Sequence, residues 1–252
     1  MRSRILVAAL AMVFVAGSAL VAVSQEAESQ LQLVAEVHVK PGLVADFEAA
    51  HNDRNERKTQ AGVSFLTRAS ISESLVYRFT TPVGDWAGVD KRGSEMGELA
   101  PAAPGMQQAV EAAIDHVDTY IRRTRPQLNY VPANPRLQPA EWGFVHRVEL
   151  YVRQGMMDEV AGVIQQAAAL YEQHDSGETF FVYSQVRGAD GPMMEIALLA
   201  ADAADFYTHA AETAAQMGEA LQGLRAQVGA LCRRIEISNH MIRRDLAYQP
   251  PG

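Results

Sequence analysis

The sequence lacks the short motifs that mark nucleotide-binding proteins and serine hydrolases. It contains no GxGxxG, no Walker-type phosphate loop and no GxSxG, so neither class of function has support. It has a single cysteine, Cys232, which excludes an intramolecular disulfide and leaves the stability of the fold to its hydrophobic core. Cys232 lies among apolar residues, and we interpret it as a small buried side chain rather than a nucleophile.

Basic residues are also scarce. The chain has 22 Lys and Arg against 30 Asp and Glu, a net charge of −8. An acidic chain without a basic stripe is poorly suited to nucleic acid, so no nucleic-acid partner is expected. The seven histidines show no HxH or HxxxH spacing and no paired cysteines accompany them. The spacing therefore predicts no metal site.

The N-terminus carries an apolar run of the kind found in export signals. Arg2 and Arg4 precede it, it extends from Ile5 to Val23, and Ala22-Val23-Ser24 offers the small residues that a signal peptidase reads. This pattern predicts a signal peptide over residues 1–24 and a secreted or periplasmic protein with no stable membrane insertion after cleavage. The alternative is an uncleaved anchor, because the run is just long enough to span a bilayer.

A short stretch of sequence occurs twice. Val37–Phe47 and Leu150–Val160 each read as the end of a strand, a basic residue, a turn containing glycine, and the start of a helix. The two glycines, Gly42 and Gly155, lie 113 residues apart. A weaker echo links Ile121-Arg122-Arg123 to Ile242-Arg243-Arg244, at a spacing of 121. The chain is therefore predicted to be an internal duplication.

Each copy opens a series of predicted elements in the order strand, helix, strand, strand, helix, strand. In the first copy these cover residues 33–40, 43–58, 63–71, 75–80, 106–116 and 117–123. In the second copy they cover residues 143–153, 156–174, 179–187, 193–200, 203–231 and 234–243. Residues 33–125 and 142–248 are thus predicted as two repeats, joined by a proline-rich linker over residues 126–141.

Two such units describe a ferredoxin-like duplication. The turn after the first strand, Asp85-Trp86 and the Asp205–His209 segment resemble the dimeric α/β-barrel superfamily, which includes antibiotic-biosynthesis-type monooxygenases. The resemblance implies an α+β fold in which the two βαββαβ repeats form an intramolecular dimeric α/β-barrel. It also implies a small aromatic or polyketide-like ligand, or haem, between sheet and helices, with His209 as the functional histidine. The first repeat has no histidine at that place.

The helix predicted over residues 43–58 has an unusual face. Val44 and Phe47 begin an apolar face. The same stripe then continues through polar residues, namely His51, Arg54 or Asn55, and Lys58. One interpretation is a polar ligand pocket with Tyr77 and Trp86 as aromatic walls, since buried polar groups without partners are costly. The other is that the helix frays into solvent after Phe47.

Polar side chains also alternate along several predicted strands. Glu149 and Tyr151 share one strand face, and His240 shares a face with Glu236 and Ser238. If the two sheets face each other, these groups would form a carboxylate–histidine network capable of proton transfer. The alternative is a structural hydrogen-bond network. The candidate catalytic residues are therefore Glu149, His209 and His240, with Tyr151 as a candidate ligand contact.

These observations favour an exported protein that binds a small molecule in a cavity between sheet and helices. The alternatives are a cofactor-independent, monooxygenase-like enzyme, in which a histidine takes a proton from an electron-rich substrate, and a structural or interaction protein of the cell envelope. No cofactor is the leading expectation, with haem as the alternative.

Overall fold

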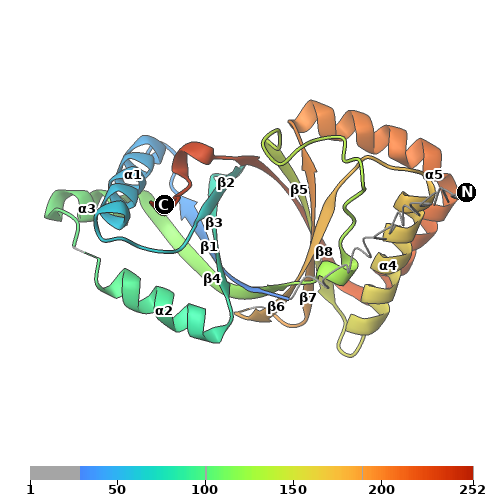
Figure 1. Ribbon diagram of the computed structural model, residues 1–252, viewed down its shortest axis with the longest axis horizontal. Coiled ribbons are helices and arrows are strands. Elements are labelled where there is room, and N and C mark those ends of the chain that lie inside the picture. The colour runs from blue at the N-terminus through green and yellow to red at the C-terminus, as the bar shows by residue number, and fades with distance from the viewer. Residues whose placement is uncertain (1–28, 100, 189, 252) are drawn as a thin grey trace, which may run out of the picture.

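The computed structural model describes residues 29–99, 101–188 and 190–251, and the predicted signal peptide lies outside them. The described chain forms one closed eight-stranded barrel with helices on two opposite sides (Figure 1). The strand order around the barrel is β1-β3-β2-β8-β5-β7-β6-β4. No helix in the described ranges combines the length and the hydropathy that crossing a membrane requires.

The first repeat supplies half of the barrel and the three helices on one side of Figure 1. Its elements are β1 (Leu31–Val39), α1 (Val44–Gln60), β2 (Arg68–Ser72), β3 (Val76–Gly84), α2 (Trp86–Gly97), α3 (Pro104–Ala113) and β4 (Ile114–Thr124). The second repeat consists of β5 (Phe144–Val152), α4 (Met157–Gln173), β6 (Phe180–Arg187), β7 (Met193–Ala200), α5 (Ala203–Leu231) and β8 (Cys232–Ile242). The predicted tandem ferredoxin-like fold is confirmed.

Two short seams join the repeats. β2 pairs with β8 over Ser70–Ser72, and β4 pairs with β6 over Ile121–Thr124, both antiparallel. The central strands of each repeat pair over much longer stretches, as in β1 with β4 over Leu31–Val39 and β5 with β8 over Phe144–Val152. The barrel is therefore two four-stranded sheets closed along their edges, so that each of the eight described strands pairs with a neighbour on both sides.

The repeat is clearest at two kinds of position where the backbone conformation restricts the residue type: the turn after the first strand and the N-cap of a helix. Gly42 and Gly155 both adopt positive φ, +86° and +82°, in the turn that follows the first strand of each repeat. Asp85 and Asp202 cap α2 and α5 by accepting a backbone N–H three residues ahead, each at 2.8 Å. The positive φ explains why a glycine occurs in both copies of the turn.

The structure changes three details of the predicted repeat. The helix predicted over residues 106–116 corresponds to α3, which ends at Ala113, so His116 lies on β4. A further helix, α2, precedes it. The predicted match between residues 121–123 and 242–244 is wrong. Arg125 and Arg243 are the structurally equivalent residues, since each precedes the 3-10 helix that follows the fourth strand, and they lie 118 residues apart. The repeat also continues beyond its fourth strand, into the short 3-10 helices η1 (Pro126–Leu128) and η2 (Arg244–Leu246).

These two tails exchange partners between the repeats. Leu128 and Tyr130, at the start of the segment predicted as a linker, pack in the hydrophobic core of the second repeat. Leu246 packs in the core of the first repeat, and Tyr248 forms an antiparallel bridge with Thr67. In Figure 1 the red C-terminal segment accordingly lies beside the blue α1. Each helix–sheet core is completed by the tail of the other repeat.

Candidate functional site

Alternation along the strands separates an apolar outer face from a polar lumen. On β1, Val37 and Val39 pack toward the helices, whereas Gln32 and Glu36 point the other way and meet arginines of other strands. The same alternation on β5 places Arg147 and Glu149 inside the barrel. The lumen is therefore lined by charged side chains, which need partners because they are withdrawn from water.

Those partners form one ion-pair network across the barrel. Glu195 of β7 accepts hydrogen bonds from Arg78 at 2.9 Å, Arg122 at 2.6 Å and Arg147 at 2.7 Å. Arg78 and Glu195 are each only 1% exposed. Arg78 also reaches Glu149 at 3.0 Å, and it contacts Glu36 and Tyr120 as well. Three strands of the first repeat and two of the second thus meet at this centre.

The network perturbs its carboxyl groups in opposite directions. Burial alone would raise the pKa of the Glu195 carboxyl, but Arg122 and Arg78 hold it below its usual range. Glu149 has fewer cationic partners, and burial raises its pKa to about 7, assisted by Glu195, Glu36 and Glu236 and opposed by Arg78. Glu195 is thus a fixed anion, whereas Glu149 exchanges a proton near neutral pH.

The two ends of the lumen differ. One end is filled by the apolar cluster of Val145, Ala197 and Leu199, with Trp142 and Phe181 packed against it. Toward the other end the polar side chains become progressively exposed, from about 16% for the Glu149 side chain to 63% for Asp118. We call this second end the open end of the lumen.

Two of the predicted site residues lie toward the open end. Glu149 contacts Arg78, and the Tyr151 hydroxyl lies 3.5 Å from a Glu149 oxygen and 3.2 Å from a Glu236 oxygen. Burial raises the pKa of Tyr151 to about 12, so its phenol keeps its proton at neutral pH. The structure therefore brings these two residues together as a carboxyl–phenol pair.

His240 lies deeper in the lumen, opposite Val145. Its Nε2 is 3.1 Å from the Ser238 hydroxyl, and its Nδ1 finds no hydrogen-bond partner within the portion of the chain that the structure describes. Burial, with a contribution from Arg78, lowers the pKa of His240 to about 4. The imidazole is thus neutral at physiological pH.

The predicted ligand contacts on the first repeat have protein partners instead. The ring of His51 stacks on Phe79, and both His51 Nε2 and Asn55 Nδ2 reach the carbonyl oxygen of Leu246, at 3.0 and 3.2 Å. The Tyr77 hydroxyl donates to Glu48 at 2.6 Å.

Trp86 lies apart at the start of α2 and is 46% exposed. The predicted fraying is wrong, since α1 continues to Gln60 and its polar stripe contacts Leu246 and Tyr248 of the second repeat's tail.

His209 occupies the outer layer, on α5. Its ring lies 2.8 Å from Glu212 and 3.4 Å from Asp205, both on the same helix. The layer between α4, α5 and their sheet is occupied by apolar side chains, including Leu150, Ile164 and Phe180. Haem needs an axial ligand beside a flat cavity, so these residues do not fit haem.

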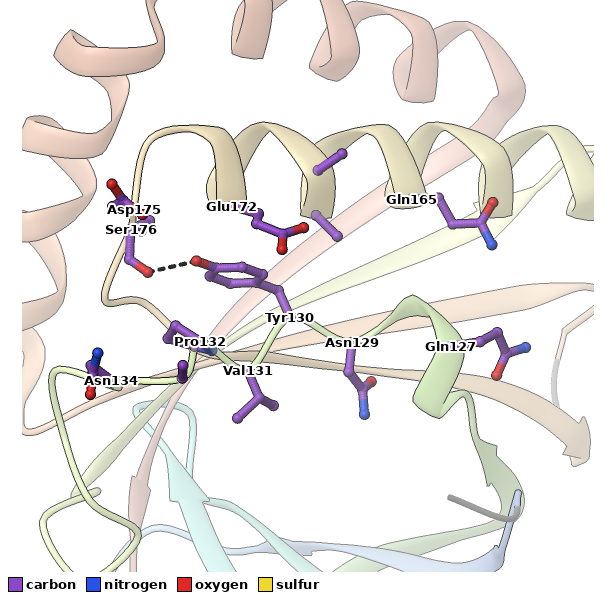
Figure 2. Close-up of a pocket in the computed structure, with 13 residues that line it drawn as sticks. Gln127, Asn129, Tyr130, Val131, Pro132, Asn134, Gln165, Glu172, Asp175 and Ser176 are labelled. Carbon is purple, nitrogen blue, oxygen red and sulfur yellow. Dashed lines mark hydrogen bonds between the residues drawn. The ribbon is translucent and has the colours of Figure 1, made fainter. Parts of the chain in front are cut away.

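A second candidate site is a groove outside the barrel, about 580 Å³ in volume, between α4 and the segment that follows η1 (Figure 2). Tyr130 lies between its walls and donates its hydroxyl hydrogen to the Ser176 carbonyl at 2.7 Å. The labelled polar residues around it are Gln127, Asn129, Asn134, Gln165, Glu172, Asp175 and Ser176.

The sequence interpretation missed the four residues that organise the lumen: Arg78, Arg122, Arg147 and Glu195. Arg78 and Glu195 each lie between two apolar neighbours on their strands, which was a readable signal for the lumen face. Arg122 is followed by Arg123 and Arg147 is preceded by His146, so their signal was weaker. The sequence did not reveal which strands of the two repeats face one another across the lumen. The predicted carboxylate–histidine network is, at its centre, a carboxylate–arginine network.

Comparison with known proteins supports the fold. No family model and no curated protein matches the sequence. A solved structure of an anthrone oxidase-like protein has a TM-score of 0.61 at 9% identity, covering 87% of this chain and 93% of that one. A putative monooxygenase from Lactobacillus acidophilus NCFM has a TM-score of 0.54 at 9% identity, covering 88% and 97%.

A mutant chlorite dismutase from Candidatus Nitrospira defluvii has a TM-score of 0.53 at 9% identity, covering 86% of this chain and 92% of that one. The predicted resemblance to the dimeric α/β-barrel superfamily is confirmed as a shared fold. At these identities the similarity concerns the fold and not the activity.

Proposed function

We propose that this dimeric α/β-barrel chain is an exported protein that binds a small molecule at the open end of its lumen and takes a proton from it. The observation that carries the proposal is Glu149, a carboxyl group with a pKa of about 7 beside Arg78 and Tyr151. A perturbed carboxyl between a buried network and an exposed rim is a candidate functional group. Export rests on the apolar N-terminal run of the sequence alone.

The chemistry of these groups suits general-base catalysis. A base is most effective when its pKa lies near the working pH, because it is then both partly deprotonated and strong enough to accept a proton. Tyr151 supplies an aromatic face and a phenol that keeps its proton, and Arg78 would stabilise the anion that remains after proton transfer. This reaction class is that of a cofactor-independent, monooxygenase-like enzyme.

The names of two structural neighbours support the same class. One is called anthrone oxidase-like and another a putative monooxygenase. Anthrone is an aromatic ketone with acidic C–H bonds, so it is a suitable first probe. Removal of one of these protons gives a carbanion that reacts with dioxygen, and the balanced overall conversion is anthrone plus O2 to anthraquinone plus water.

The test measures oxygen uptake and anthraquinone formation with the purified protein and anthrone. We expect acceleration over the uncatalysed reaction, and a loss of roughly 100-fold or more in Glu149→Gln, which keeps the shape but not the basicity. His209→Ala is the matched variant, because the resemblance to the superfamily implied that His209 is the functional histidine. Activity that survives Glu149→Gln and disappears in His209→Ala would refute a base in the lumen.

A binding function without catalysis is the second candidate, favoured by the groove beside α4. Native mass spectrometry of the purified protein would reveal a co-purifying small molecule. Ala169→Phe narrows the groove from an exposed helix position, and Glu149→Gln leaves the groove intact. Loss of the bound mass in Ala169→Phe alone would assign the ligand to the groove. A protein without ligand or activity would fit the structural alternative.

A further inference from the structure

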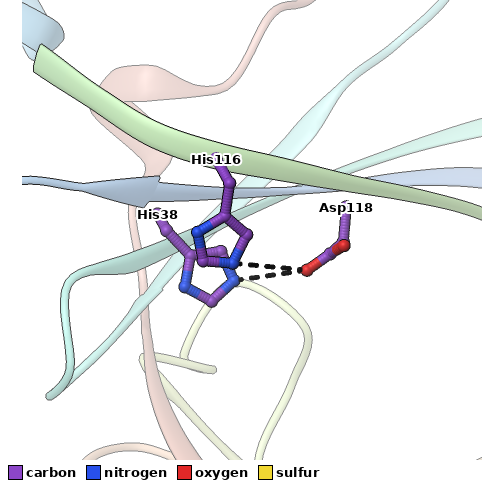
Figure 3. A group of neighbouring side chains, drawn as sticks. All are labelled: His38, His116 and Asp118. Carbon is purple, nitrogen blue, oxygen red and sulfur yellow. Dashed lines mark ion pairs between the residues drawn. The ribbon is translucent and has the colours of Figure 1, made fainter.

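Two histidines and an aspartate converge at the open end of the lumen (Figure 3). His38 of β1 and His116 of β4 are directly opposite in the strand register, and their rings stack with centroids 3.7 Å apart and an interplanar angle of 19°. The Nε2 atoms of both rings point at the same atom, Oδ2 of Asp118, each from 3.6 Å. One ligand atom from each residue lies within 4.8 Å of the other two.

A further carboxylate supports this arrangement from outside. The Nδ1 of His116 lies 2.9 Å from Oδ2 of Asp115, so the ring can donate its Nδ1 hydrogen there and direct the free Nε2 lone pair inward. Histidines that bind metals are commonly oriented in this way, through a carboxylate on the second ring nitrogen. The tautomer of His116 thereby suits a ligand.

In the second repeat, an arginine neutralises the carboxylate at the position equivalent to Asp118. The register places Tyr151 opposite Arg234, as His38 is opposite His116, and Glu149 opposite Glu236, as Glu36 is opposite Asp118. The Arg234 guanidinium stacks 3.8 Å from the centroid of Tyr151 and pairs with Glu236 at 3.2 Å.

The second repeat therefore holds a carboxylate, an aromatic ring and a permanent cation. The first repeat holds the carboxylate and two rings, but imidazoles carry no permanent charge. An external cation bound between the three side chains would complete the equivalent arrangement.

We propose that His38, His116 and Asp118 bind a divalent transition-metal ion, with Zn²⁺ as the type case. Two imidazole nitrogens and one carboxylate oxygen are typical ligands for Zn²⁺, whereas Mg²⁺ and Ca²⁺ prefer oxygen ligands alone. Three protein ligands leave a coordination position for water or a small anion. The site depends on β1 and β4 and does not require Glu149 to be a catalytic base.

Spacing along the sequence does not reveal this site. His116 and Asp118 are two residues apart on one strand, and His38 lies 78 residues earlier. The three side chains meet only because β1 and β4 are neighbours in the barrel and share a lumen face.

The test titrates the protein, purified without a histidine tag, with Co²⁺ as a spectroscopic probe and then with Zn²⁺. We expect one Co²⁺ per chain, with visible d–d absorption that disappears as one equivalent of Zn²⁺ displaces it. His116→Ala and Asp118→Asn should each weaken Co²⁺ binding at least tenfold. Asp115→Asn should also weaken it by about tenfold or more, because the outer carboxylate orients His116.

The control is His209→Ala, which removes a histidine that also sits beside two carboxylates but lies on α5. It should leave the affinity unchanged. Circular dichroism and thermal melting without metal establish that each variant is folded. Absence of stoichiometric binding in the folded wild type, or binding that His116→Ala and Asp118→Asn leave intact while His209→Ala removes it, would overturn the proposal.

Discussion

The two repeats have the same fold but opposite charges where they meet. Arg78 of β3 and Glu195 of β7 occupy equivalent places, since Arg78 is opposite Glu36 and Glu195 is opposite Glu149 in the register of each repeat. Across the lumen these two residues form an ion pair with each other. Two identical subunits would place like charges at both positions. Tandem duplication in one chain permits the two positions to become complementary.

The same comparison separates the two helix layers. α4 packs an apolar face onto its sheet, whereas α1 carries His51, Asn55 and the buried Lys58 along the corresponding stripe. Burial, reinforced by Arg54 and Arg92, lowers the pKa of Lys58 to about 7. The polar stripe of α1 is tolerated because the tail of the second repeat offers it a backbone carbonyl at Leu246.

The largest expected effect comes from removing the charge of Glu195. Glu195→Gln leaves Arg78, Arg122 and Arg147 without their shared anion, and breaking a buried ion network in this way costs about 3–5 kcal/mol. Urea denaturation measures the loss, with the exposed Glu212→Gln as a control expected within about 0.5 kcal/mol of wild type.

Combining Glu195→Gln with Arg78→Gln sharpens the comparison. Because the two residues contact each other, their effects should not add, with a coupling of roughly 0.5–3 kcal/mol. A loss below about 1 kcal/mol in Glu195→Gln would contradict the role of this pair in joining the repeats.

A matched pair of substitutions tests the exchanged tails. Leu128→Ala and Leu246→Ala each remove a fully buried leucine and should each cost about 2–5 kcal/mol. The informative readout is where the loss appears. Amide hydrogen exchange should accelerate in α4 for Leu128→Ala and in α1 for Leu246→Ala, because each tail packs on the other repeat. Each variant controls for the other, and faster exchange confined to the variant's own repeat would contradict the exchange of tails.

Much of the fold could be predicted because its signals are local. The turns at Gly42 and Gly155 need positive φ, and the alternation along β1 and β5 needs two different environments. Both constraints are recorded in adjacent residues. The tails were harder to predict, because the prolines after Thr124 are typical of a linker. The burial of Leu128 depends instead on contacts with α4 and β6, which lie later in the sequence.

The site was less predictable because it is built across the barrel. Glu149 and Tyr151 could be identified from one strand face, whereas their partners Arg78 and Glu236 come from strands far away in the sequence. The His38–His116–Asp118 cluster is an example of the same difficulty. Resemblance to a superfamily pointed to His209, but that residue lies on the outer layer with carboxylates of its own helix.

The pH dependence of stability distinguishes Glu149 from an ordinary carboxyl group. Its folded pKa of about 7 exceeds the unfolded value of about 4.3, so protonation favours the folded state. This contribution is fully present below about pH 4.3 and is lost as the pH rises through about 7. Glu149→Gln mimics the protonated form, so the variant should gain stability relative to wild type across this range, by up to roughly 4 kcal/mol.

Chemical denaturation of both proteins between pH 4.5 and 8 measures that gain. His51 and His240, whose pKa values burial lowers to about 4, act in the opposite sense. Because both are neutral in the folded protein, their contribution to the free energy of unfolding decreases as the pH falls below about 6.5. Both histidines are present in both proteins, so their effect cancels in the difference. A difference that stays constant across the pH range would mean that the pKa of Glu149 is the same in the folded and unfolded states, and it would remove the basis for Glu149 as a proton acceptor at neutral pH.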